Sequence, residues 1–203
     1  MLGIDMDLAD LVKFLENTWW LFGIILYYIN NRISKFRNKY KHEGQVEHDI
    51  KNLSLIYERL IKYRIDFNAS RITITQFHNG EKYYSNNSIL KMSITHESDD
   101  DGVSRVFNDY QNILVSRYNK FIEILLKEEI VQYKKISELP STYQDDMLLD
   151  LKLRGTENFY SIKLLSKSGN IIGFLSLCFI GDEELDIDKF KEFGNIIGFS
   201  LRS

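Results

Sequence analysis

The 203-residue chain has a single cysteine, a single proline and no excess of basic residues, and each shortage excludes a class of protein. Cys178 cannot form an internal disulfide or a metal site built from several thiolates. It lies in the apolar run 171–180, where we expect a buried small hydrophobe. The 26 basic side chains face 29 acidic ones, for a net charge of −3, whereas nucleic-acid-binding domains usually have a basic excess. We therefore expect no nucleic-acid partner.

Linkers and repeats are missing as well. Pro140 is the one proline, and no stretch is rich in Pro, Gly or Ser, of low complexity or repeated. Hydrophobic residues make up 44% of the chain, enough for one core but too little for two ordinary domains plus an anchor. The many Lys, Asn, Ile and Tyr residues resemble the bias of AT-rich genomes, such as those of many bacteriophages and low-GC bacteria. We expect one domain, residues 43–203, behind an N-terminal segment, residues 1–42.

The N-terminal segment contains the uncharged run TWWLFGIILYYI, residues 18–29. Its twelve residues would span about 18 Å as a helix, against roughly 30 Å of bilayer hydrocarbon. Extension back to Leu11 reaches about 28 Å but includes Lys13 and Glu16. We expect a membrane anchor that spans the bilayer or lies in its interface, and a buried core helix is the alternative. The anchor residues are Trp19, Trp20, Leu21, Phe22, Ile24, Ile25, Leu26, Tyr27 and Tyr28.

The flanks of this run exclude a signal peptide and predict an orientation. Acidic residues precede the run, whereas a cleaved signal peptide has basic ones there. Five basic residues follow it, and by the positive-inside rule they keep the C-terminal part in the cytoplasm. We therefore expect the bacterial inner membrane as the location, with the domain facing the cytoplasm. The five are Arg32, Lys35, Arg37, Lys39 and Lys41.

The segment from Asn30 to Arg64 has no proline and predicts a helix. Its apolar residues follow one another at intervals of four, three, four, three and four, which also fits a short coiled-coil seam. One interpretation is a helix packed on its own domain, and the other is a homo-oligomer paired through residues 46–64. The stripe consists of Val46, Ile50, Leu53, Tyr57, Leu60 and Arg64.

The rest of the chain alternates strand and helix patterns. Strand periodicity is expected at 71–77, 89–95 and 131–139, with turn residues at 78–80 and a solvated acidic loop at 98–102. Helical spacing is expected at 112–129, 143–153 and 185–201. The segments 159–165 and 171–180 predict a hairpin whose second arm, apolar on both faces, is central in its sheet.

This order of elements, together with RITITQFHNG at 71–80 and GNIIGFLSL at 169–177, resembles the GAF family of small-molecule sensor domains. The resemblance covers residues 46–203 and implies an α/β (α+β) fold, in which helices flank an antiparallel sheet. The Asn-Lys-Phe…Asp…Glu pattern of the cyclic-nucleotide-binding members is missing, and Cys178 is not placed like a bilin-attaching cysteine. The resemblance therefore implies the fold without a particular ligand, and we expect no cofactor.

Two shorter resemblances concern the source of the chain. Residues 77–85, FHNGEKYYS, resemble a GAF subgroup of phage and bacterial proteins with N-terminal anchors. Residues 79–86 are similar to a stretch of T-even phage holins, which also place a short membrane segment before an α/β domain. Such a holin exposes its domain outside the inner membrane, which conflicts with the orientation above. A holin-like lysis protein or a virion component is therefore the alternative function.

The candidate ligand-binding residues lie where the first two strands end, because a polar and aromatic mixture near a sheet edge suits a small ligand. His96 and Glu97 are adjacent on a strand and point to opposite faces, so they do not predict a metal site. No nucleophile elbow, phosphate-binding glycine loop or HExxH motif is present, and we expect no enzyme activity. The candidates are His78, Asn79, Tyr83, Tyr84, Ser85, His96 and Glu97.

The sequence therefore predicts a membrane-anchored, non-catalytic GAF-like sensor or interaction domain of phage or bacterial origin. Its ligand or protein partner is expected to contact residues 78–85 and the strand that ends at His96. The signal is expected to pass through the helix of residues 46–64.

Overall fold

The computed structural model describes residues 7–82, 88–140 and 145–201. The chain divides into two units, residues 1–51 and residues 52–203. The boundary falls within helix α1, Leu8–Asp66, whose last turns belong to the second unit. The domain boundary at residue 42 that the sequence suggests stays a prediction.

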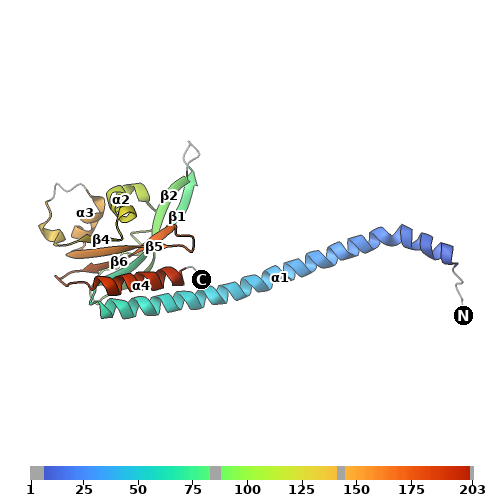
Figure 1. Ribbon diagram of the computed structural model, residues 1–203, viewed down its shortest axis with the longest axis horizontal. Helices are drawn as coiled ribbons and strands as arrows, with labels where there is room; N and C mark the ends of the chain where they lie inside the picture. The colour runs from blue at the N-terminus through green and yellow to red at the C-terminus, as the bar shows by residue number, and fades with distance from the viewer. Residues whose placement is uncertain (1–6, 83–87, 141–144, 202–203) are drawn as a thin grey trace. The chain divides into compact units, whose positions relative to one another are not determined.

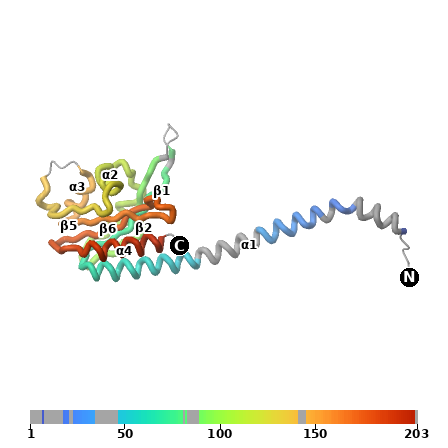
Figure 2. The backbone as a smooth tube through the Cα atoms, in the orientation of Figure 1, coloured from blue at the N-terminus to red at the C-terminus, as the bar shows by residue number. Residues whose placement is uncertain are grey.

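The second unit contains a six-stranded antiparallel sheet in the order β3-β2-β1-β6-β5-β4 (Figure 1). The strands are β1 Arg71–Lys82, β2 Ser88–Asp99, β3 Ile113–Leu114, β4 Ile130–Tyr133, β5 Asn158–Leu165 and β6 Ile171–Phe179. The helices are η1 Val115–Tyr118, α2 Asn119–Lys127, η2 Ile136–Glu138, α3 Asp146–Leu153 and α4 Ile187–Ser200. Helices α2 and α3 lie over one face, and α4 lies with the end of α1 over the other (Figures 1 and 2).

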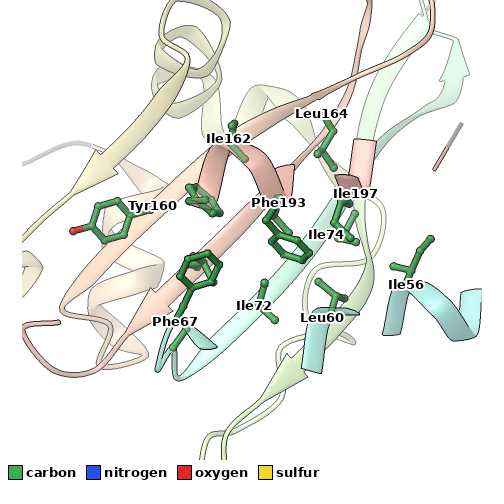
Figure 3. Close-up of a cluster of buried hydrophobic side chains, with 14 of the residues drawn as sticks. Ile56, Leu60, Phe67, Ile72, Ile74, Tyr160, Ile162, Leu164, Phe193 and Ile197 are labelled. Carbon is green, nitrogen blue, oxygen red and sulfur yellow. The ribbon is translucent and has the colours of Figure 1, made fainter. Parts of the chain in front are cut away.

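The face under α1 and α4 holds the larger hydrophobic core (Figure 3). Ile72 and Ile74 of β1 point into it, because alternate residues of a strand face the same side. The Tyr63 ring of α1 stacks on Phe193 of α4 at 3.8 Å between centroids. Each fully buried apolar side chain of this size contributes about 1.5–3 kcal/mol. This packing attaches α4 and the end of α1 to the sheet.

The opposite face carries a second core under α2 and α3. Phe174 of β6 lies under Phe121 of α2, with their ring centroids 5.2 Å apart. Met147 and Leu151 of α3 are buried on the same side. Between these apolar residues the strands also present polar side chains, and this mixed surface contains the candidate site described below.

The structure confirms the antiparallel sheet with flanking helices, the hairpin and the central position of its second arm. The turn expected at residues 78–80 is wrong, because β1 continues to Lys82 by pairing with β2. The helix expected at 112–129 is in fact β3, η1 and the shorter α2, and the strand expected at 131–139 is β4 followed by η2.

The solvated acidic loop expected at 98–102 is also wrong in its first half. Ser98 and Asp99 belong to β2, and the Asp99 side chain is 8% exposed because it pairs with Arg71. Asp100 and Asp101 are exposed, as expected for a turn. Arg71 is the first residue of β1, and its ion pair with Asp99 keeps the Asp99 carboxylate buried.

Along the first unit, helix α1 exposes large apolar side chains. Trp19 is 75% exposed, Tyr27 69% and Tyr28 73%. Trp20, Ile24, Ile25 and Leu26 are exposed as well. No helix in the described part of the chain is both long and apolar enough to cross a bilayer.

Candidate functional site

A pocket of about 50 Å³ lies on the sheet face under α3, and we call it the inner pocket. Strands β1, β2, β5 and β6 supply its floor and sides, and α3 and the segment before β3 close it. The lining residues are Arg71, Thr73, Thr75, Met92, Ile94, Val106, Tyr110, Met147, Leu151, Arg154, Phe159, Phe174, Ser176 and Cys178.

Part of the floor of the inner pocket is polar, although most of the lining is apolar. Arg71, Thr73 and Thr75 alternate along β1 with the isoleucines of the opposite core, so strand geometry directs them to this side. Thr73 is 6% exposed and Thr75 4%, and neither hydroxyl has a hydrogen-bond partner among the described residues. The Ser176 hydroxyl beside them donates to Ser161 Oγ at 3.1 Å. Both residues line the pocket, so their hydroxyls are available to a ligand or to water.

The charge of Arg71 is already neutralised within the protein. Its Nε lies 2.8 Å from Asp99 Oδ1 and 3.3 Å from Glu97 Oε1, and its Nη2 donates to the Ser104 carbonyl. Burial raises the pKa of Glu97, although the amides of Val106 and Phe107, each donating at 2.8 Å, oppose this. Arg71 and the two carboxylates form a buried ionic cluster at one end of the pocket.

Tyrosines and an arginine form the roof. Arg154, at the end of α3, lies over the Tyr110 ring with Cζ 5.2 Å from the centroid, and pairs with Asp109 at 3.0 Å. The Tyr118 hydroxyl donates to Asp150 of α3, and Tyr110 donates to the same oxygen at 3.3 Å. Burial raises the pKa of both tyrosines, so both remain protonated donors near neutral pH. These contacts hold α3 over the pocket.

A second pocket of about 380 Å³, the outer pocket, borders the inner one. Arg71 and Arg154 line both, so these two side chains separate the two spaces. The other lining residues are Gly102, Val103, Ser104, Leu153 and Ile180.

The chain matches no protein-family model and no curated protein sequence. Solved structures match it well. The GAF domain of PixJ from Thermosynechococcus elongatus aligns with a TM-score of 0.56 at 16% identity, covering 75% of this chain and 86% of that chain. The cyanobacteriochrome receptor PixJ aligns with a TM-score of 0.55 at 16% identity, covering 75% and 96%. The phycocyanobilin-bound GAF domain of a cyanobacterial phytochrome aligns at 0.56 and 12% identity, covering 78% and 86%.

The domain has the GAF fold. At these identities the likeness concerns the fold alone, and it agrees with the resemblance drawn from residues 71–80 and 169–177.

The GAF-like fold separates the residues that the sequence suggested as a ligand site. His78 lies on β1 beyond the inner pocket, with Nε2 2.9 Å from Ser93 Oγ, and Asn79 is exposed. Tyr83, Tyr84 and Ser85 lie outside the described residues. A site at residues 78–85 stays a prediction.

His96 and Glu97 point to opposite faces of β2, as the sequence analysis expected. His96 is 2% exposed under α1, and its ring centroid lies 5.0 Å from that of Tyr57. Its Nδ1 is 3.0 Å from Thr95 Oγ1, and its Nε2 has no hydrogen-bond partner among the described residues. Glu97 instead faces the ionic cluster around Arg71.

Few groups among the described residues of the domain suit metal binding or nucleophilic chemistry. Within residues 7–82, 88–140 and 145–201, no three His, Cys, Asp or Glu side chains lie close enough together to hold a metal ion. Cys178 is buried, as expected, and burial raises the pKa of its thiol to about 11, so it is protonated near neutral pH.

Sequence reasoning missed the residues of the inner pocket. The alternation of residues 71–77 predicts a strand, but it does not predict that Arg71, Thr73 and Thr75 line a pocket. Their polarity on one face of that strand was a usable signal, because a strand covered on both sides usually reads as apolar throughout. Tyr110 and Arg154 carried no comparable signal, since both lie in segments without clear periodicity.

Proposed function

We propose that this chain is a membrane-anchored sensor protein that does no chemistry, and that its GAF domain binds a small molecule in the inner pocket. The observation that carries the proposal is the pair of threonines, Thr73 and Thr75, which line a pocket and whose hydroxyls have no hydrogen-bond partner among the described residues. One structural neighbour is described as phycocyanobilin-bound and another as a receptor, which supports ligand sensing as the use of this fold.

The non-catalytic part of the proposal rests on the surroundings of His78 and Ser93. Their side chains are 2.9 Å apart, the arrangement of a general base and a nucleophile. The Ser93 hydroxyl, however, is 8% exposed and already accepts the Asn112 amide at 2.8 Å. No carboxylate within the described residues orients His78, so a triad is not assembled.

Membrane anchoring is supported by the exposed apolar helix of the first unit. Aromatic and aliphatic side chains lie all round α1 between Trp19 and Ile33, most of them more than half exposed. Water is a poor environment for such a surface, and tryptophan and tyrosine favour the level of the lipid headgroups. The basic residues 32–41 after this run support a domain on the cytoplasmic side.

A second copy of the chain is the proposed partner along α1. Leu60 of the stripe and its neighbour Ile56 pack into the domain's own core, as the first interpretation expects for this end of the helix. Leu53, Tyr57 and Ile61 remain 47%, 39% and 48% exposed, and they share one side of the helix. This remaining surface supports pairing through residues 46–64.

Two experiments test the anchoring and the orientation. A compartment-sensitive reporter fused at Ser203 of the full chain should be active in the cytoplasmic form and inactive in the periplasmic form. Activity of the periplasmic reporter would contradict the cytoplasmic sensor and favour the holin-like alternative. Deletion of residues 1–42 should give a soluble, folded domain that no longer floats with lipid vesicles. If the full chain is soluble without detergent and the truncated chain aggregates, the helix is a core or assembly element.

A further inference from the structure

We infer that the inner pocket selects a small uncharged molecule, with a hydrogen-bonding group held by Thr73 and Thr75 and a short apolar group facing α3. This inference rests on the proposed function, since it names the class of ligand that the sensor would take. Three features lead to it: the free hydroxyls on the floor, the pairing of each charge that lines the pocket, and the small volume.

The hydroxyls set the polar end of the ligand. Thr73 and Thr75 are two residues apart on β1, so their side chains point to the same side. Each hydroxyl can donate once and accept twice, so the pair can bind an amide, a hydroxyl or a carbonyl. The α3 side chains over them, Met147 and Leu151, are apolar, and so is Phe174 of β6, the cross-strand neighbour of Thr75.

The charges exclude an ionic ligand. Arg71 and Arg154 are the charged residues that line the pocket, and each is paired, Arg71 with Glu97 and Asp99 and Arg154 with Asp109. An entering anion would find no unpaired cation to offset the loss of its hydration, which is a large cost in a buried site. A cation would meet carboxylates that are already occupied, because Glu97 also accepts two backbone amides. A neutral molecule avoids both costs.

The volume limits the size. A pocket of about 50 Å³ is well below the roughly 300–1,000 Å³ of sites for drug-sized ligands. It exceeds the roughly 10–15 Å³ that one water needs, so it has room for a molecule of a few non-hydrogen atoms.

Methionine methyl groups offer a direct readout. The chain has four methionines, and two of them, Met92 and Met147, line the inner pocket. The experiment labels methionine methyl groups with carbon-13 in the purified full chain and titrates three probes of the same shape. Acetamide is neutral, acetate is an anion and acetamidinium is a cation. We expect acetamide to shift the Met92 and Met147 resonances saturably, and the two ions to bind at least tenfold more weakly.

Variants test the role of the hydroxyls. Thr73→Val and Thr75→Val keep the side-chain shape and should each weaken acetamide binding about three- to tenfold, the effect of one neutral hydrogen bond. Thr75→Ser keeps a hydroxyl and should retain most of the affinity, which controls for misfolding. Thr95→Val is the matched control, because the Thr95 hydroxyl donates to the Ile74 carbonyl at 3.3 Å and does not line the pocket.

Each other outcome contradicts a defined part of the inference. Equal or tighter binding of acetate or acetamidinium at these methionines would overturn the neutral ligand class and leave ligand sensing intact. Tighter binding of benzamide would overturn the size limit and again leave the proposed function intact. If none of these probes moves either resonance, the pocket holds only water, and both the ligand class and the sensing of a ligand in this pocket are wrong.

Discussion

The guanidinium of Arg154 lies over the ring of Tyr110, with 5.2 Å between Cζ and the ring centroid. This contact joins the end of α3 to the segment before β3, and it holds Arg154, which lines both pockets and forms the partition between them. The partition is held by a cation–π contact and one ion pair rather than by apolar packing. It is therefore a weaker part of the boundary than the floor, which belongs to the central strands.

Replacement of Arg154 tests this partition. Arg154→Leu should lower the free energy of unfolding by about 1 kcal/mol, because it removes a partly buried cation–π contact and an exposed ion pair with Asp109. Urea denaturation monitored by circular dichroism would measure this. Arg105→Leu is the control, since Arg105 is an exposed arginine, and it should change stability by less than about 0.5 kcal/mol. Equal effects of the two changes would contradict a specific role for Arg154.

The ionic cluster leads to a larger prediction. Asp99→Asn should lower the free energy of unfolding by about 3 kcal/mol, because it leaves the buried Arg71 with Glu97 as its remaining carboxylate, at 3.3 Å. The control is Asp101→Asn, in the exposed turn that follows β2. A loss below about 1 kcal/mol, the range of a surface pair, would show that the cluster is more solvated than its burial indicates.

His96 predicts a pH dependence of stability. Burial lowers the pKa of His96 from its ordinary value of 6.5, so below that pH the unfolded chain binds more protons than the folded one. Stability should therefore fall as the pH drops from about 7.5 to 5.5. His96→Phe keeps a ring against Tyr57 and should reduce this pH dependence, as thermal unfolding at several pH values would measure. His48→Gln, an exposed histidine of α1, is the control and should leave the pH dependence of stability unchanged. If His96→Phe shows the same pH dependence as the wild-type protein, His96 is not the group responsible.

Gly173 leads to a prediction about the pairing of β1 with β6. A Cβ at Gly173 would lie 2.1 Å from the Thr75 carbonyl oxygen and 2.9 Å from Gln76 Cα, both in backbone that cannot move aside easily. Gly173→Ala should therefore lower the melting temperature, with a loss of about 3 kcal/mol. Gly23→Ala, with no atom within 4 Å, should leave the domain as stable as before. If Gly173→Ala melts at the wild-type temperature, β1 and β6 can move apart at this point without a loss of stability.

For some elements, the local sequence pattern was sufficient to predict the structure. The hairpin of β5 and β6 followed from turn residues between two apolar arms, because a short turn and the strand period together define a hairpin. The central place of β6 followed from apolar residues on both its faces. For residues 78–80, by contrast, turn-forming residues were extended by pairing with β2, because cross-strand hydrogen bonds outweigh local preference.

The sequence by itself determined the fold class, the hairpin with its central second arm and the apolar run near the N-terminus, because these depend on patterns within a short stretch. Only the tertiary structure decided the inner pocket. Arg71 meets Glu97 and Asp99 through the register of β1 on β2, which shifts at a bulge between Ile74 and Thr75. Arg154 reaches Tyr110 from 44 positions further along the chain. Such contacts depend on register and on helix placement, and no local period in the sequence encodes either.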